Sequence, residues 1–393
     1  MKRKICLTVF TFFLFLLTLL LLFPLSGCWD STDIENRAFA VAIGIDSEID
    51  SINESQDRFI FFATLANPSN LEDGAADSEN NAPSATGQTV VEAITTLDVG
   101  SSSELFLGQV KTIVLGKNLL EDPDLFREAI GTIENHDEID KTITVIAANS
   151  IPDILTASSQ NTPKLGYNAV NAVNFYRIAP KSGGRSFHKT FNDMTTELRA
   201  SGNTLLPFVQ EIQEDRKNVK NNNDGFRVNG ALAIKDYQLV GELDGNQLRG
   251  LLWATNKACE GAILTTEDHV PMVVRHHRSN LHFSEESGNL RCIIDIRIKG
   301  EISHYEIDPF QNGITPQDNS LIDRALNEEY RQIITMEIDQ AIQKLQHEFE
   351  LDSFNFKKSL RKQKYSLYQR YSNDWNQAFI NMEIIPVVHC ITI

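Results

Sequence analysis

The first 27 residues constrain the fate of the chain more than any other stretch. Basic residues near the start precede an almost unbroken apolar run, Ile5–Phe23, and the sequence becomes polar and mixed from Trp29 onward. A basic start, an apolar centre and small residues at the boundary are the parts of a secretory leader. We therefore predict that residues 1–27 are a signal peptide and that residues 28–393 form a folded body outside the cytoplasm.

A cysteine stands at the boundary of this leader, in Leu25-Ser26-Gly27-Cys28. The tetrapeptide resembles the lipobox of bacterial lipoproteins, which implies that Cys28 becomes the new N-terminus and carries S-diacylglycerol and N-palmitoyl groups. Several acyl chains anchor a protein stably, since each buried methylene contributes about 0.8 kcal/mol. Two alternatives remain: an uncleaved membrane helix, which needs roughly 20 apolar residues, and simple secretion.

The charge of the chain limits its partners. Asp and Glu number 53 against 36 Lys and Arg, giving a formal net charge of −17. Such a body gains little from phosphates, which argues against nucleic acid as a partner. The same charge argues against electrostatic adhesion to anionic lipid, so the acyl chains must hold the membrane. A hydrophobic content of 41% is ordinary for a globular body, and its length suits two or three domains.

Periodicity predicts strands alternating with helices in the first half. Strands are expected over Ala38–Ile45, Arg58–Leu65, Leu105–Leu115 and Thr142–Ala147, the first two pairing as a hairpin. Helices are expected over Thr89–Leu97, Asp124–Glu134, Ile151–Ala157 and Thr190–Ala200. The polar stretch Asn67–Gln88 is interpreted as a surface loop. This alternation is typical of a layered α/β domain.

A polar stretch without apolar period, residues 213–225, is interpreted as a linker between an N-terminal domain (28–212) and a C-terminal domain (226–393), itself divisible into two subdomains. Strands are predicted over Phe226–Ile234, Gln238–Leu243, His269–His277, Leu281–Glu285, Leu290–Ile298 and Asn381–Ile393, and helices over Gln247–Ala254, Leu321–Phe349 and Phe356–Arg370. The fold class expected is α+β or mixed α/β, in two to three mixed domains with antiparallel-rich sheets and packed helices.

Two features of the C-terminal half allow more than one interpretation. The apolar stripe of the Leu321–Phe349 helix is interpreted as core, with a partner-docking face as the alternative. Trp253 and Trp375 are interpreted as core or groove residues rather than as ligand-stacking ones.

No catalytic spacing is present in the sequence. A nucleophile elbow, a zinc-protease helix, a phosphate loop and a dinucleotide fingerprint are all absent. Five histidines gather in one region: His269, His276, His277, His282 and His304. Since neighbours on a strand point to opposite faces, His276 and His277 cannot share one metal ion without distortion. We therefore expect surface or strand histidines, no metal, no cofactor and no enzymatic activity.

The cysteines of the body are few. Cys259, Cys292 and Cys390 remain beyond Cys28, so at most one disulfide can form within the chain, and the sequence leaves open whether any of them pair. A disulfide framework is excluded for a body of this size.

Three stretches of the chain carry specific residue patterns. The first is Gly27-Cys28-Trp29-Asp30 with the strand end Gly44-Ile45-Asp46. The second is Gly230–Ile234 with Arg249-Gly250-Leu251-Leu252-Trp253. The third comprises Gln343–Asp352, Trp375, Phe379 and the closing strand. Together they resemble the Ger(x)C family, the lipoprotein C subunits of the nutrient germinant receptors of spore-forming bacteria.

The chain departs from the family pattern in two places. Glu134–Ile139 replaces an acidic, Arg-bearing segment. Leu351-Asp352-Ser353-Phe354-Asn355 replaces an Asp-Ile-Phe-Gly-like segment, keeping the acid and losing the glycine. These differences concern local contacts in the two segments and do not argue against membership of the family.

The resemblance implies a body of mixed α/β domains, lipid-anchored at Cys28 on the outer face of the spore inner membrane. Its implied partners are a multi-span membrane subunit and a larger subunit with soluble and membrane parts. We therefore hypothesise a non-catalytic receptor subunit acting in spore germination. The alternative is a solute-binding lipoprotein that delivers a small ligand to a membrane transporter, and a more distant one is an enzyme of the cell wall.

Overall fold

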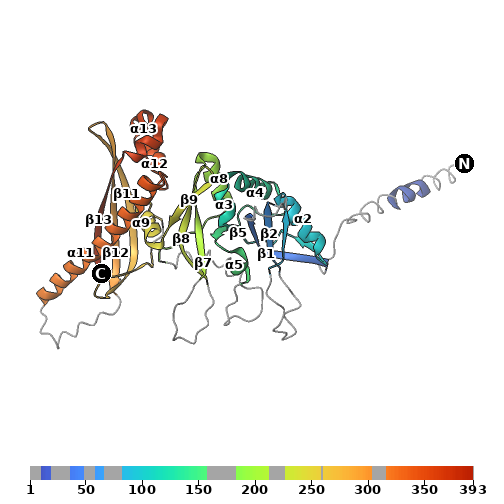
Figure 1. Cartoon of the computed structure of the whole chain (residues 1–393), viewed down its shortest axis with the longest axis horizontal. Coiled ribbons are helices and arrows are strands. Elements are labelled where there is room, and N and C mark those ends of the chain that lie inside the picture. Colours follow the sequence, from blue (N-terminus) through green and yellow to red (C-terminus); the bar gives the residue numbers. More distant parts are fainter. Residues whose placement is uncertain are drawn as a thin grey trace, which may run out of the picture.

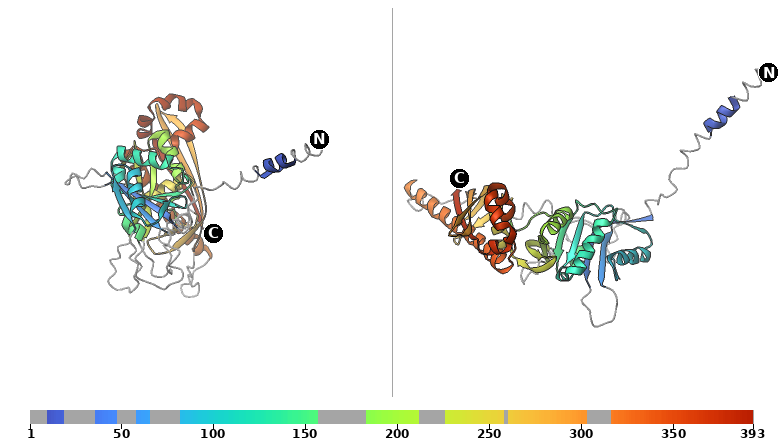
Figure 2. Two further views of the ribbon diagram at one scale, coloured as in Figure 1. Left: turned by 90° about the vertical axis from the view of Figure 1, so that its right-hand side faces the viewer. Right: turned by 90° about the horizontal axis from the view of Figure 1, so that it is seen from above.

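The computed structural model describes residues 10–18, 36–47, 58–65, 82–156, 183–211, 226–257, 260–302 and 316–392. The described elements form an elongated body in which two β-sheets follow one another along the long axis, with helix α9 (Gly245–Ala254) between them (Figure 1, Figure 2). Both sheets mix parallel and antiparallel pairing and both carry helices. The predicted mixed α/β class is confirmed.

The first sheet has nine strands, in the order β3-β2-β1-β5-β6-β7-β8-β9, with β4 pairing β1. Its centre, β1-β5-β6-β7, is parallel, and both flanks are antiparallel. The strands are β1 (Arg37–Ser47), β2 (Phe59–Leu65), β3 (Ser84–Gly87), β4 (Glu104–Phe106), β5 (Thr112–Gly116), β6 (Thr144–Ala148), β7 (Thr204–Glu211), β8 (Phe226–Lys235) and β9 (Gln238–Leu243).

Helices cover both faces of this sheet. On one face lie α2 (Val90–Gly100), α3 (Lys117–Glu121), α4 (Pro123–Asn135) and α8 (Phe191–Ser201), whose apolar residues share one core. On the other lies α5 (Ile151–Thr156), where Ile151 packs with Val114 and Ile146. Every residue of β5 and β6 is therefore buried. Burial on both faces explains why these strands read as apolar runs rather than alternating patterns.

The second sheet has four strands in the order β10-β11-β12-β13. They are β10 (Ile263–Thr265), β11 (Pro271–Glu286), β12 (Asn289–Ile302) and β13 (Glu383–Thr392), with β12 and β13 parallel and the other pairs antiparallel. The remaining helices are α11 (Pro316–Ile342), the π-helical turn η5 (Gln343–Glu348), α12 (Phe356–Gln363), α13 (Tyr365–Tyr371), the short 3-10 turn η6 (Ser372–Asp374) and α14 (Trp375–Ile380).

Among the described residues, helices cover one face of the second sheet and leave the other uncovered. Ile294, Ile296 and Ile298 of β12 are buried against α9 and α11, and the residues between them point outward. The alternation predicted for β12 is therefore confirmed. The stripe of the long helix is core, as preferred from the sequence, because Ile334, Ile338, Ala341, Ile342, Leu345 and Phe349 all lie in the same cluster.

Four expectations about single elements were wrong in detail. Leu105–Leu115 is not one strand, because a turn closed by the Val110 N–H on the Leu107 carbonyl (3.1 Å) separates β4 from β5. His269–His277 and Leu281–Glu285 belong mainly to one long strand, β11. Phe356–Arg370 is two helices, α12 and α13, which meet at Lys364. The end of the expected Asn67–Gln88 loop forms strand β3.

The predicted linker, residues 213–225, lies outside the described residues. The strands on either side of it, β7 and β8, are antiparallel neighbours in the first sheet. The segment therefore joins two paired strands, and the division of the chain into domains at this point stays a prediction.

Candidate functional site

The predicted lipidation site, Cys28, lies outside the described residues. Residues 10–18, within the predicted leader, are helical, with Phe10, Phe12 and Phe15 exposed. Among the described residues, no helix combines the length and the apolar character needed to cross a bilayer. Lipidation of Cys28 stays a prediction.

The strand end Gly44-Ile45-Asp46 forms the junction between β1 and α3. The Asp46 carboxylate accepts the Leu119 N–H (3.0 Å), the Ser47 N–H (2.9 Å) and the Asn118 side-chain amide (3.3 Å). Burial raises the pKa of Asp46, and these donors partly oppose the rise. A Cβ at Gly116 would lie 1.9 Å from Cγ of Asp46, so the carboxylate fits only beside a glycine. This motif has a packing role.

The segment Arg249–Trp253 joins α9 to α11 through a buried ion pair. The Glu337 carboxylate of α11 accepts hydrogen bonds from Nε (2.9 Å) and Nη2 of Arg249. It also accepts a hydrogen bond from Nε1 of Trp253 (2.9 Å). The Arg249 and Glu337 side chains are only 6% and 3% exposed. Three charge-assisted hydrogen bonds thus compensate the desolvated carboxylate. Trp253 is fully buried, which confirms its interpretation as a core residue.

The glycine of the same segment sets the distance between the two helices. A Cβ on Gly250 would lie 2.0 Å from the backbone oxygen of Glu337. The start of α9 is held by a capping box in which Asp244 and Gln247 satisfy each other's backbone N–H groups. We call Arg249, Gly250, Trp253 and Glu337 the α9–α11 joint.

The segment that departs from the family pattern after the long helix holds the start of α12. The Asp352 carboxylate accepts the N–H groups of Phe356 (3.0 Å) and Lys357 (2.9 Å) at the start of α12, and Nε1 of Trp375 (3.2 Å). Asn355 stands where the pattern has glycine, with φ of 60°. Asparagine is among the residues that best tolerate this left-handed conformation, so the loss of the glycine is accommodated.

The histidines do not gather into one site. His277 is half-buried, lies edge-on to Trp253 and shares a 2.9 Å hydrogen bond with the Trp253 carbonyl. Burial lowers its pKa. His269, His276 and His282 are exposed, and His304 lies outside the described residues. In the part of the chain that the structure describes, no three His, Cys, Asp or Glu side chains are placed to hold a metal ion.

Two of the cysteines are placed and are unpaired. Cys292 lies opposite Ile384 and Cys390 opposite Ile298, six positions apart along β13. At about 3.3 Å per residue this separation is roughly 20 Å, far beyond disulfide reach. Burial raises the pKa of the Cys390 thiol to about 11 and that of Cys292 further. A raised pKa disfavours the thiolate, which is the nucleophilic form of cysteine. Cys259 lies outside the described residues.

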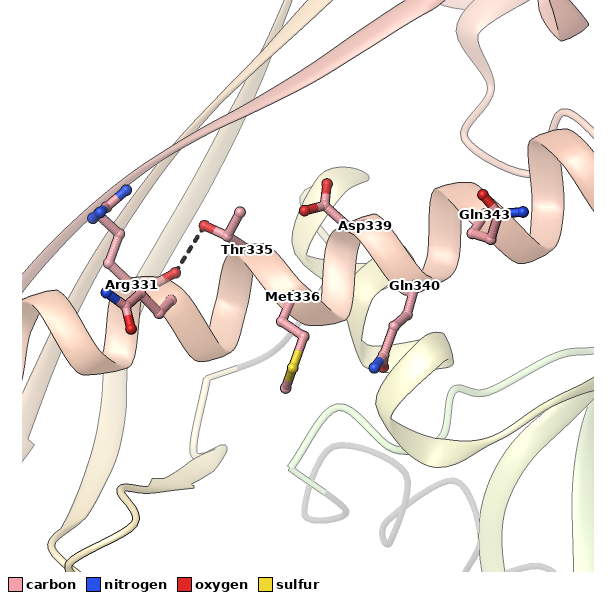
Figure 3. A pocket seen from close by; sticks show the side chains of 7 residues that line it. Arg331, Thr335, Met336, Asp339, Gln340 and Gln343 are labelled. Carbon is pink, nitrogen blue, oxygen red and sulfur yellow. Dashed lines mark hydrogen bonds between the residues drawn. The ribbon is translucent and has the colours of Figure 1, made fainter.

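Two open hollows lie on the second half of the body. One, of about 540 Å³, runs along the exposed side of α11, where the side chains from Arg331 to Gln343 spread along the helix rather than converging on one point (Figure 3). The other, of about 510 Å³, lies between the end of α9, β11 and α12 and is lined by amides and hydroxyls, including Asn256, Ser279, Asn280 and Ser359.

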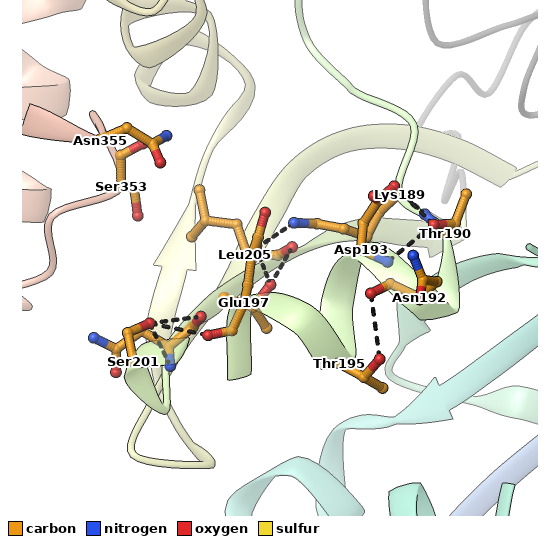
Figure 4. Close-up of polar contacts among 12 residues, drawn as sticks. Lys189, Thr190, Asn192, Asp193, Thr195, Glu197, Ser201, Leu205, Ser353 and Asn355 are labelled. Atoms are coloured by element: carbon orange, nitrogen blue, oxygen red, sulfur yellow. Dashed lines mark hydrogen bonds and ion pairs between the residues drawn. The ribbon is translucent and has the colours of Figure 1, made fainter. Parts of the chain in front are cut away.

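A buried lysine near the first sheet was not foreseen from the sequence. Lys189 pairs with Glu197 of α8, and the same carboxylate accepts the Thr204 hydroxyl (2.6 Å) (Figure 4). The Lys189 side chain is 6% exposed, and burial lowers its pKa. The contact ties the segment before α8 to the start of β7. A single lysine in a polar stretch gives no sequence signal for such a role.

Both halves of the chain match known protein families. Residues 30–211 match the family described as "Spore germination protein N-terminal domain", and residues 229–390 match "Spore germination B3/ GerAC like, C-terminal". The chain belongs to this spore germination family. The resemblance seen in the sequence is thereby confirmed, and with it a role in spore germination.

Relatives of the family align over most of this chain. Spore germination protein B3 of Bacillus subtilis (strain 168) is 22% identical, covering 91% of each chain. Spore germination protein KC of the same organism is 23% identical, over 93% of this chain and 90% of its own. The crystal structure of the GerBC protein superposes with a TM-score of 0.57 at 14% identity, covering 90% of this chain and 98% of GerBC. That likeness concerns the fold.

Proposed function

We propose that this protein is the lipid-anchored, non-catalytic subunit of a nutrient germinant receptor, held at the outer face of the spore inner membrane through Cys28. The observation that carries the proposal is the match of both halves of the chain to one germination family. The lipobox-like Leu25–Cys28 supplies the anchor in this account.

The use of the family residues supports a non-catalytic role. Asp46, Arg249 and Asp352 are charged residues of the segments that resemble the family. The side chain of each makes hydrogen bonds that join one element to the next. Such residues build a rigid body rather than a reactive centre. In the proposal this body docks on a multi-span membrane subunit and on a larger subunit with soluble and membrane parts.

Anchoring on a common membrane makes weak docking sufficient. Proteins that are tethered to one surface encounter each other at a high effective concentration. Short flexible tethers raise it to the millimolar range. In the proposal the tether runs from Cys28 to the start of β1 at Arg37, a short stretch that keeps the body close to the bilayer. The same proposal places the boundary between the N-terminal and C-terminal domains at residues 213–225.

The experiment that tests the proposal is Cys28→Ala in spores. We expect the variant to lose its lipid, to leave the membrane fraction and to abolish or strongly slow the response to nutrients, while Cys390→Ala serves as the matched control that keeps both. Mass spectrometry of the mature wild-type protein should show acyl groups on residue 28. A Cys28→Ala protein that stays membrane-bound and responsive contradicts lipid anchoring at this residue.

The second candidate is a solute-binding lipoprotein that delivers a small ligand to a transporter. The amide- and hydroxyl-lined hollow around Asn256 and Ser359 is the feature that favours it. A ligand that binds only the folded state raises the melting temperature. A melting shift with amino acids or sugars, lost in Asn280→Ala, supports this second function, and unchanged melting across such a panel opposes it.

A further inference from the structure

The outward face of the second sheet carries a local cluster of basic side chains, although the chain as a whole has a net charge of −17. Two neighbouring rows of outward-pointing side chains cross β11, β12 and β13. One row is His276–Lys299–Ile391 and the next is Arg278–Arg297–His389. We call the five basic residues of these rows the cationic face; they and Ile391 are exposed.

The pairing within these rows opposes the stability of the isolated sheet. Arg278 lies directly opposite Arg297. Like charges at directly opposed positions destabilise a sheet, because their Cβ atoms are only about 4.5–5.5 Å apart. A sheet that places cations in this way is suited to an anionic partner that neutralises them.

The acidic residues neutralise only part of this face. Asp295 pairs with Arg297 (3.2 Å) and lies 3.6 Å from Nε2 of His389, while Glu301 pairs with Arg275 (2.7 Å) and Glu383 with Arg291 (3.1 Å). Arg278 and Lys299, by contrast, have no ion pair among the described residues. Two exposed cations are therefore available to a partner.

Apolar side chains lie among these cations. Ile391 is 52% exposed and Val387 is 36% exposed, both on the same side of β13. Side chains on one side of a strand repeat every two residues, roughly 6.6 Å. An extended segment that carries carboxylates and aliphatic groups on one side would match this spacing in both charge and apolar contact.

We propose that the cationic face is the docking surface for an acidic segment of a partner protein. A lipid surface fits less well, because Asp295 and Glu301 flank the two rows and would face uniformly negative headgroups. A partner protein can place its own charges to avoid them, as complementary interfaces do. This inference rests on the proposed function as a docking subunit and names its surface.

The test uses the full-length protein reconstituted in phosphatidylcholine vesicles and a fluorescent peptide of alternating glutamate and valine. The double variant Arg278→Glu/Lys299→Glu should bind the peptide at least about tenfold more weakly than wild type, as expected when interfacial cations are reversed. The control Lys358→Glu/Lys362→Glu changes two exposed lysines of α12 and alters the net charge equally. It should bind as wild type does. Matching circular dichroism and melting curves show that both variants fold.

Three outcomes overturn the proposal. Equal loss in the two double variants shows an effect of net charge alone. Loss of wild-type binding when the vesicles contain an equal amount of phosphatidylglycerol shows that the face contacts lipid. Self-association of wild type that Arg278→Glu/Lys299→Glu abolishes, seen by sedimentation in detergent, shows that a second copy occupies the face. Each leaves the germination role standing, because that role is tested separately by Cys28→Ala.

Discussion

The two sheets of this protein differ in what covers them. The nine-stranded sheet has helices on both faces, and its central strands β5 and β6 are buried throughout. The four-stranded sheet has helices on one face only, and its other face presents charged residues such as Arg297 and Lys299 to solvent. The first sheet is therefore buried between helices, and the second has one face that is open to solvent and to partners.

The contrast shows where change can be tolerated. A substitution in β5 or β6 meets packed neighbours on either side, so its effect is on stability. A substitution on the outer face of β12 meets solvent and can alter recognition without unfolding the chain. The α9–α11 joint lies between the two sheets and connects them through helices α9 and α11.

The largest effect is expected from breaking this joint. Glu337→Ala leaves Arg249 buried without its partner and should lower the free energy of unfolding by about 3–5 kcal/mol. Urea unfolding followed by circular dichroism measures it. Glu348→Ala, which removes an exposed pair with Lys344, should change little. Equal costs for the two variants would show that the buried pair does not hold the sheets together.

A smaller effect is expected from adding one methyl group at the joint. Gly250→Ala should cost about 1–3 kcal/mol, because its Cβ would meet the Glu337 backbone oxygen at 2.0 Å. Gly131→Ala in α4 is the matched control, since nothing lies within 4 Å of its Cβ position. It should stabilise the protein by about 0.5–1 kcal/mol through helix propensity. A stabilising Gly250→Ala would mean that the helices can separate freely.

The smallest effect concerns pH and the covered side of the second sheet. Because burial lowers the pKa of His277 below its ordinary 6.5, the unfolded chain takes up a proton more readily than the folded one. Stability should be full above about pH 6.5 and fall as pH decreases through the lowered pKa. His277→Gln should flatten this decline in melting temperature, while His276→Gln on the exposed side should keep it. An equal decline in His277→Gln would assign it to other groups.

The sequence predicted most elements because their patterns were local. The apolar spacing of α4 and α11 and the alternation of Ile294, Ile296 and Ile298 each specify one element and its buried side. Strand β7 gave no such signal, since Pro207 interrupts it and proline argues against an inner strand. The structure accommodates Pro207 with a register shift against β8.

The candidate site was less predictable than the fold. Arg249 and Trp253 were recognised as part of a segment that resembles the family. Their common partner, Glu337, lies 84 to 88 positions away. It belongs to a helix for which the sequence was interpreted only through its apolar stripe. The cationic face was missed for a similar reason. Arg278, Arg297 and His389 are scattered in the sequence, and only the register of three strands brings them together.

The close packing at Gly250 has a mechanical consequence. Helix α9 follows β9 after a single residue, Asp244, and is locked against α11, which in turn covers the second sheet. Lys235 in the first sheet also bonds to the Phe349 carbonyl and to Glu350 beyond that helix (both 3.2 Å). We therefore expect a displacement of the second sheet to reach β9 through α11 and α9, because the two helices are in close contact at Gly250 and Lys235 adds a second link.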